Sequence, residues 1–146
     1  MFTKSCKYAI RAVMYLATES SEEKKSGVDE IATALEVPKH FLAKILQRLT
    51  RNRIISSAKG RNGGFYLSRA NQTSNLLAVI ECMDGPSAFN DCVLGLESCS
   101  NENPCPYHNT VKKYRDAFFE VIKNETIGES ASRIKSHNFR LRSSTS

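Results

Sequence analysis

Three cysteines and a histidine occur close together near the middle of the chain. Cys92, Cys99, Cys105 and His108 follow the pattern C-x6-C-x5-C-x2-H. The residues between them are mostly Gly, Ser, Asn, Glu and Pro, which do not build a hydrophobic core. Thiolate and imidazole groups bind zinc and iron–sulfur clusters alike, and a bound metal orders such a segment. The pattern therefore favours a metal or cluster site.

Spacing alone does not separate zinc from iron, and two other interpretations of the thiols stay open. The cysteines could be free in a flexible loop, or they could form a disulfide switch. A Cys–His nucleophile is least favoured, because no third group or substrate pocket is visible beside the pair, and we expect no enzyme. The chain has five cysteines; Cys6 and Cys82 lie in apolar helical contexts and are predicted to be small core residues.

Positive charge gathers in the first half of the 146-residue chain, whose net charge is +6. Residues 1–70 contain 13 Lys or Arg and 6 Asp or Glu, against 8 and 9 in residues 71–146. The stretch from Lys39 to Arg69 has 8 basic residues and no acidic one. Such a stretch on a small domain indicates a polyanionic partner.

No apolar run approaches the roughly 18–20 residues that cross a bilayer. The N-terminus alternates charged and apolar residues and lacks the apolar centre of a signal peptide. We therefore expect a cytoplasmic protein without a membrane partner.

The basic stretch lies on elements in the order of a winged helix-turn-helix. A helix beginning at Val28 should break at 36–38, because the residue before Pro38 resists the helical conformation. A second helix, PKHFLAKILQRLTRN, follows. Segments 54–57 and 65–67 are β-prone and are joined by a glycine-rich hairpin loop. The core side of the second helix is predicted to carry Phe41, Leu42, Ile45, Leu46 and Leu49.

Ten residues of the second helix and the hairpin are predicted to contact DNA. The N-terminal end of such a helix usually meets base edges in the major groove, and later basic residues meet phosphates. Glycines let the hairpin backbone approach phosphates, and its basic side chains reach the minor groove. The alternative is a solvated basic helix beside an ordinary hairpin, and the order of the elements favours DNA. The predicted contacts are Pro38, Lys39, His40, Lys44, Gln47, Arg48, Arg51, Lys59, Arg61 and Asn62.

The remaining helices are predicted over about 5–18, 75–83 and 107–123. The last of these carries an apolar stripe at helical spacing, typical of packing against a partner or an internal core. The stripe consists of Val111, Tyr114, Phe118, Val121 and Ile122.

The predicted fold is mainly α, with a small β-hairpin wing and a long C-terminal helix. Its predicted parts are a winged domain over 1–70, a short helix and cysteine-rich loop over 71–106, a long helix region over 107–130 and a disordered tail over 131–146.

Taken together, these features resemble the Rrf2 family of bacterial winged-helix regulators over roughly residues 2–130. The motifs that carry the resemblance are FTKSCKYAIRAVMYLA at the start, VDEIATALEVPKHFLAKILQRLTRNRII through the helix-turn-helix, SAKGRNGGFYLSR at the wing, the cysteine triplet, and TIGE at 126–129.

The resemblance implies a homodimer whose winged domains read a near-palindromic operator in double-stranded DNA. It makes 107–130 the dimerisation helix region, in which the two long helices cross and the apolar stripe from Val111 to Ile122 forms the dimer interface. It also implies an iron–sulfur cluster held by Cys92, Cys99 and Cys105, with His108 as fourth ligand. We favour [2Fe–2S], with [4Fe–4S] open.

The resulting expectation is a transcriptional regulator that acts as a repressor and senses iron–sulfur status, redox state or nitric oxide. One alternative is a winged-helix regulator with zinc or a thiol/disulfide switch in place of a cluster. Another is a zinc-stabilised interaction module whose basic face binds RNA or an acidic protein.

Overall fold

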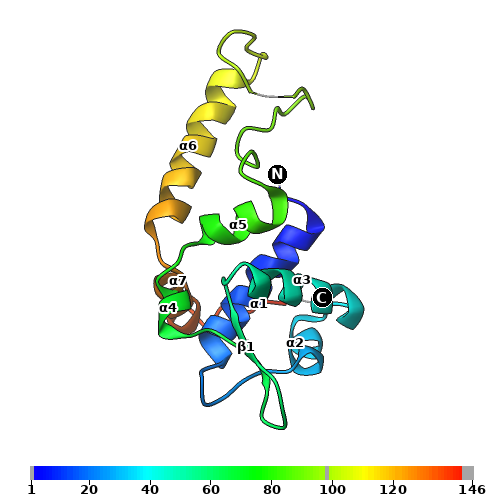
Figure 1. The fold of residues 1–146 in the computed structure, drawn as a ribbon. Coiled ribbons are helices and arrows are strands. Elements are labelled where there is room, and N and C mark those ends of the chain that lie inside the picture. The colour runs from blue at the N-terminus through cyan, green and yellow to red at the C-terminus, as the bar shows by residue number, and fades with distance from the viewer. Residues whose placement is uncertain (1, 98, 143–146) are drawn as a thin grey trace.

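The computed structural model describes residues 2–97 and 99–142, and these form a mainly helical winged fold, as predicted (Figure 1). Within the described residues, no helix is both long and apolar enough to cross a membrane. The elements are α1 Lys4–Glu19, α2 Val28–Leu35, α3 Lys39–Arg51, β1 Ser56–Ala58, β2 Gly64–Tyr66, α4 Arg69–Gln72, α5 Leu76–Asp84, α6 His108–Asn124 and α7 Ile127–Ser136.

Helix α1 is the centre of the molecule. The Thr3 hydroxyl caps it by accepting a hydrogen bond from the Cys6 N–H. Helices α2, α3, α5 and α7 pack around it. Its apolar stripe, which includes Val13 and Leu16, is fully buried in the main hydrophobic core. That core therefore joins the helix-turn-helix to the C-terminal helix.

The break between α2 and α3 forms where the sequence predicts it. Glu36 adopts a left-handed conformation with φ 57° and ends α2, and its N–H donates to the carbonyls of Ala32 and Thr33. Val37 is buried, which anchors the turn, and Pro38 precedes the first residue of α3. The two helices therefore meet through a three-residue turn, as in a helix-turn-helix.

The wing is an antiparallel pair in which Ser57 lies opposite Phe65. The first strand begins later than predicted, because Ile54 and Ile55 are buried in the main core and do not pair. The wing is tied to the α1–α2 loop: Ser26 N–H donates to the Phe65 carbonyl, and Phe65 N–H donates back to that of Ser26, at 2.9 and 2.8 Å.

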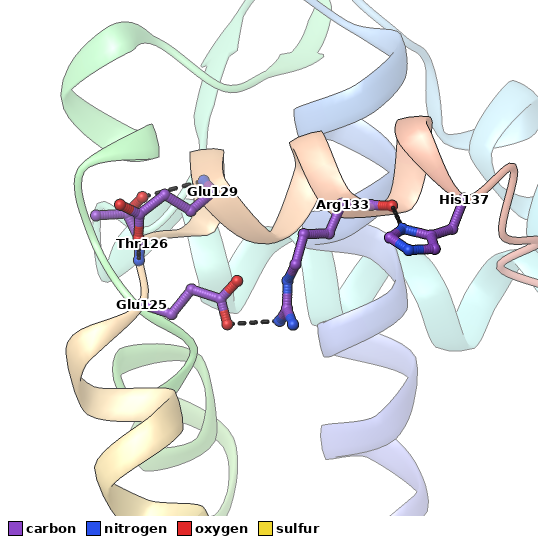
Figure 2. A network of polar contacts seen from close by, with 5 residues as sticks. All are labelled: Glu125, Thr126, Glu129, Arg133 and His137. Atoms are coloured by element: carbon purple, nitrogen blue, oxygen red, sulfur yellow. Dashed lines mark hydrogen bonds and ion pairs between the residues drawn. The ribbon is translucent and has the colours of Figure 1, made fainter.

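The C-terminal part is more ordered than the sequence indicated. Helix α7 runs to Ser136, and Thr126 and Glu129 form a capping box at its start. The Arg133 guanidinium forms an ion pair with the Glu125 carboxylate at 2.6 Å, and His137 Nδ1 donates a hydrogen bond to the Arg133 carbonyl (Figure 2). The predicted tail is thus helical and packed as far as Ser136; residues 143–146 of that tail lie outside the described part.

Residues beyond α7 contact the helix-turn-helix through Arg11. This side chain donates from Nε to the Leu141 carbonyl at 2.6 Å and from its terminal nitrogen to the Leu35 carbonyl. Arg142 also lies 3.7 Å from the Glu36 carboxylate. The chain after α7 is therefore held against α1 and the end of α2.

A second, smaller hydrophobic cluster lies where α1, α5 and α6 meet the start of the cysteine segment. It buries Cys6, Ile80, Ala88, Phe89 and Ile122. The Phe89 ring lies 5.7 Å from Phe2 and 5.4 Å from Phe119, in edge-to-face arrangements that favour aromatic pairs. This cluster anchors the cysteine segment to the body of the protein.

Replacing Gly64 by alanine should destabilise the protein by about 1–3 kcal/mol, because its φ of +145° strains other residues. A Cβ there would also lie 2.8 Å from the Ser26 carbonyl oxygen. Gly128→Ala is the matched control: it lies in α7 with only ordinary contacts, and it should be neutral or stabilise by up to about 1 kcal/mol. Urea unfolding of both variants measures the difference, and equal midpoints would contradict the tight wing contact.

Candidate functional site

The side chains predicted to contact DNA form an outward face of α3 and the wing, and all ten positions are exposed. The opposite side of α3 buries Leu42, Ile45, Leu46 and Leu49. Phe41, expected on the core side, is 41% exposed and meets the Tyr8 ring edge-on at 6.1 Å. It belongs to the surface between α3 and α1.

A groove of about 680 Å³ lies between α3 and the wing. Gln47 and Arg51 line it from α3, and Lys59 lines it from the wing loop. Arg61 and Asn62 are exposed farther out on the same loop. Among the described residues, no acidic side chain lines this groove, so its charge suits a phosphate backbone.

A second groove, of about 570 Å³, lies on the other side of α3. His40, Lys44 and Arg48 occupy successive turns of α3 and line it, together with Thr3 and Ser5 from the start of α1. The sequence analysis did not single out these two hydroxyl residues; the available signal was their position at the start of a helix that also carries Lys4 and Lys7. Lys39 lies apart and pairs with Asp29 of α2 at 2.7 Å.

The cysteine segment, residues 85–107, connects α5 to α6 without a helix or strand among its described residues. Phe89 fixes its beginning in the second cluster. Farther on, the Cys99 N–H donates to the Asn90 carbonyl at 2.9 Å, which folds the segment back on itself. Gly95 adopts φ +79°, and its N–H donates to the Cys92 carbonyl. The segment is therefore a compact loop.

His108 is the first residue of α6 and is 6% exposed. Its Nδ1 lies 3.2 Å from the Cys99 sulfur, and its Nε2 lies 2.7 Å from Oδ1 of Asn101. An amide oxygen only accepts, so Nε2 carries the proton and the Nδ1 lone pair faces the sulfur. An outer hydrogen bond of this kind orients histidines that bind metals. Asn101 is a site residue that the sequence alone did not single out.

The four predicted ligands are only partly brought together. Cys105 lies in the turn before α6, where its carbonyl accepts the His108 N–H at 3.0 Å. Cys92 lines a hollow of about 410 Å³ with Val93 and Val111, whereas Cys99 and His108 line a neighbouring one of about 430 Å³. In residues 2–97 and 99–142, no three His, Cys, Asp or Glu side chains converge closely enough to hold a metal.

The donor set nevertheless fits a metal or cluster in its chemistry. Thiols and a correctly oriented imidazole border adjoining hollows, and all five cysteines are free. Gathering the set requires the turn that carries Cys92 and the turn that carries Cys105 to bring their thiols toward Cys99 and His108. Both turns lie outside any helix or strand, so no regular hydrogen-bond ladder opposes the movement.

Helix α6 has two distinct faces. His108, Arg115 and Ile122, spaced by seven residues, are buried against the protomer. The side chains of Tyr114 and Val121 are 73% and 54% exposed. Val111 and Phe118 are half-buried beside them. Ile122, predicted at a dimer interface, is placed instead in the second intramolecular cluster, because it is the neighbour of Val121 and points about 100° away around the helix.

The two remaining cysteines lie away from this segment. Cys6 is fully buried, and burial, reinforced by the Asp84 carboxylate, raises the pKa of its thiol to about 12. Burial also raises the pKa of Cys82, although Arg48 opposes that effect. Both thiols stay protonated at neutral pH, so neither provides a reactive thiolate. This agrees with their predicted role as packing residues.

Comparison with known proteins adds to this geometry. The model of the Rrf2 family, described as "Iron-dependent Transcriptional regulator", matches residues 2–132. The chain belongs to the Rrf2 family. Its members are transcriptional regulators, so this Rrf2 protein is a winged-helix transcriptional regulator and not an enzyme.

Relatives of this Rrf2 protein include Protein aau3 of Rhizobium meliloti (strain 1021), which is 37% identical over 128 residues, 87% of this chain and 82% of that protein. The regulator NsrR of Geobacillus kaustophilus (strain HTA426) is 30% identical over 137 residues, covering 87% and 86%.

Solved structures share the fold. CymR, the global cysteine regulator of B. subtilis, superposes with a TM-score of 0.70 at 22% identity, covering 91% of this chain and 97% of that one. IscR of T. potens superposes with a TM-score of 0.69 at 16% identity, covering 95% and 91%. At these identities the likeness supports the winged-helix fold alone.

Replacing Arg61 by alanine should weaken binding to operator DNA and lower the slope of log K against log salt by about 0.9, the loss of one phosphate contact. Lys113→Ala removes the same charge from the exposed surface of α6 and should leave the slope unchanged. Fluorescence anisotropy from 50 to 200 mM salt measures both, with DNA selected from genomic fragments. An Arg61→Ala slope equal to that of the wild type would place the wing off the DNA.

Proposed function

We propose that this Rrf2 protein is a homodimeric repressor that binds a near-palindromic operator and reports the state of an iron–sulfur cluster held by its cysteine segment. The observation that carries the sensing part is the contact of Cys99 with a buried, correctly oriented His108. The proposed ligands are Cys92, Cys99, Cys105 and His108, and [2Fe–2S] is favoured.

The DNA-reading part of the proposal rests on the two grooves beside α3. Side chains at the N-terminal end of α3, among them His40 and Lys44, would meet base edges, and Arg48 and Arg51 would meet phosphates. Lys59 and Arg61 would extend the contact into the adjacent minor groove. All of these side chains are exposed, and they lie in a stretch of the chain that contains no acidic residue. The acidic group that pairs with this stretch is Asp29 of α2, which holds Lys39.

The proposed homodimer interface is the outer face of α6. Tyr114 and Val121 are large apolar side chains exposed over two turns of one helix face, with Val111 and Phe118 beside them. Crossing two such helices would bury both copies of this face, as in a twofold interface. Ile122 would support the interface only from behind, through the second cluster.

The cysteine segment is placed to change the position of α6. Its beginning is fixed by Phe89, and its end is His108 on α6 itself. Drawing Cys92 toward Cys99 would tighten this connection, and releasing it would loosen the start of the helix. A bound cluster would supply a cross-link that oxidation, nitrosylation or loss can break. A change of 1.4 kcal/mol in the preferred dimer geometry would alter operator affinity tenfold.

A second candidate is a regulator in which zinc or a thiol/disulfide switch replaces the cluster. It is supported by the free state of all five cysteines, which leaves their thiols available for zinc or for a disulfide, and by the separate hollows that Cys92 and the Cys99–His108 pair line. The structural likeness to a cysteine regulator is compatible with it. Metal analysis decides between the two candidates.

Replacing Cys99 by serine should abolish the visible absorption of anaerobically purified protein and reduce its iron and sulfide to background, because the central ligand is lost. Cys82→Ala is the matched control, since it removes a thiol outside the segment and should keep the spectrum. Far-UV circular dichroism checks that both variants fold. An unchanged spectrum in Cys99→Ser would refute the ligand, and stoichiometric zinc without iron in the wild type would favour the second candidate.

Replacing Tyr114 by glutamate should convert the dimer into a folded monomer, because the interface would have to bury an unpaired carboxylate at a cost of several kcal/mol. Lys113→Glu is the control: it changes the charge of the neighbouring residue by two units, against one unit in Tyr114→Glu, and this variant should remain dimeric. Sedimentation equilibrium gives the mass of each variant. A dimeric Tyr114→Glu protein would remove the outer face of α6 from the interface.

A further inference from the structure

Arg115 is a buried cation beside the cysteine segment, and the proposed function has not used it. Its side chain is 9% exposed, and it is the residue that lines both hollows, the one with Cys92 and the one with Cys99 and His108. It follows His108 by seven residues, which is close to two turns of helix, so both side chains lie on one face of α6. Helical side chains lean toward the N-terminus, which directs Arg115 toward His108.

The charge of Arg115 is not neutralised within the described residues. One guanidinium nitrogen donates to the backbone carbonyl of Asp91 at 3.2 Å. No carboxylate of residues 2–97 or 99–142 lies within 4.0 Å of its nitrogens. A buried cation without an anionic partner is costly, and an anion placed beside it would lower that cost.

Other charged groups border the same hollows. Glu81, Lys112 and Asp116 line the hollow of Cys99 and His108, and Lys112 and Asp116 pair with each other at 2.9 Å on the exposed side of α6. Asp91 lines the hollow of Cys92 and contributes the carbonyl that Arg115 holds. Arg115 is thus a buried charged side chain that borders both the hollow of Cys92 and the hollow of Cys99.

The proposed metal site becomes anionic when it is filled. Three thiols lose their protons to solvent, a core of charge +2 enters, and the neutral imidazole adds nothing, so the site goes from zero to a net charge of −1. This sum is the same for Zn²⁺, Co²⁺ or an oxidised [2Fe–2S] core, and one-electron reduction of the last takes it to −2. A fixed positive charge nearby favours each of these changes.

We infer that Arg115 is the built-in counter-charge of the cysteine site: it stabilises the filled, anionic state and, through Asp91, holds the turn that carries Cys92. Arg115 is a positioning and charge-setting residue and does not bind the metal. This inference rests on the proposed function, because it needs the cysteine segment to bind a metal or cluster.

The test is an anaerobic titration of the full-length, cluster-free protein with Co²⁺, followed through thiolate-to-cobalt absorption. Arg115→Gln should bind Co²⁺ about tenfold more weakly than the wild type, whereas Arg115→Lys, which keeps the charge, should stay within about threefold. Lys113→Gln removes a charge from the exposed side of α6 and should match the wild type. Arg115→Met fills the same space without charge and replaces the glutamine variant if that one unfolds.

The reduction potential of the cluster-reconstituted protein is a second readout, and a purely structural role of Arg115 would not change it. A tenfold shift of the reduction equilibrium corresponds to 59 mV for a one-electron couple. Arg115→Gln should lower the midpoint potential by about this amount, because reduction adds negative charge, and Arg115→Lys should not.

Equal cobalt affinity and equal potential in Arg115→Gln and wild type would overturn the inference and leave the proposed function standing. An Arg115→Lys protein as impaired as Arg115→Gln would also overturn it, because shape and not charge would then matter. A wild type that binds neither Co²⁺ nor a cluster would overturn the inference and the proposed function together.

Discussion

The packing of α1 against two hydrophobic clusters holds the DNA-reading elements and the cysteine segment in one arrangement. The apolar stripe of α1, which includes Val13 and Leu16, packs in the main core. Cys6, on another side of the same helix, packs in the second cluster. Ile10 contacts both clusters. Through this close packing α1 connects the cluster of Phe89 and Ile122 to the base of α3, which α5 also contacts directly.

The cysteine segment combines an anchored frame with a movable part. Phe89 and His108 are buried at its two ends, whereas Cys92 lies on a turn held by few hydrogen bonds. The contact with Asn101 restricts the His108 ring, and a ligand that is already restricted costs less to order on binding. The anchored ends of the segment raise its affinity for a metal or cluster, and the turn that carries Cys92 can still change conformation when the site is filled or emptied.

Local signals were sufficient to predict the helix-turn-helix and the wing. Pro38 restricts the backbone at the break, and the hairpin glycines permit the positive φ angles that a tight loop needs, so local residues determine those turns. The late start of β1 was not predictable in this way, because Ile54 and Ile55 are strand-prone yet are drawn into the main core. The order of the C-terminal residues depends on Arg11, which lies far away in sequence.

The candidate site also contains features that local sequence determines and features that only the folded structure determines. Cysteine spacing identified the ligand candidates, because ligand chemistry is carried by residue type. Arg115 and Asn101 are ordinary residue types whose meaning appears only once the loop folds beside α6. Val121 and Ile122 are equally apolar in sequence, and only the second cluster determines which of them faces outward.

The double contact of Arg11 bears on how this protein can vary over evolution. Both of its acceptors are main-chain carbonyls, those of Leu35 and Leu141, and every residue type supplies such an oxygen. The link therefore places no demand on the side chains at positions 35 and 141, although Leu35 is required by the core, and it demands a particular side chain at position 11 alone. Lysine would not replace Arg11, since one ammonium lacks the planar fork that spans two separate oxygens. One substitution at position 11 would thus release the end of the chain and the end of α2 together.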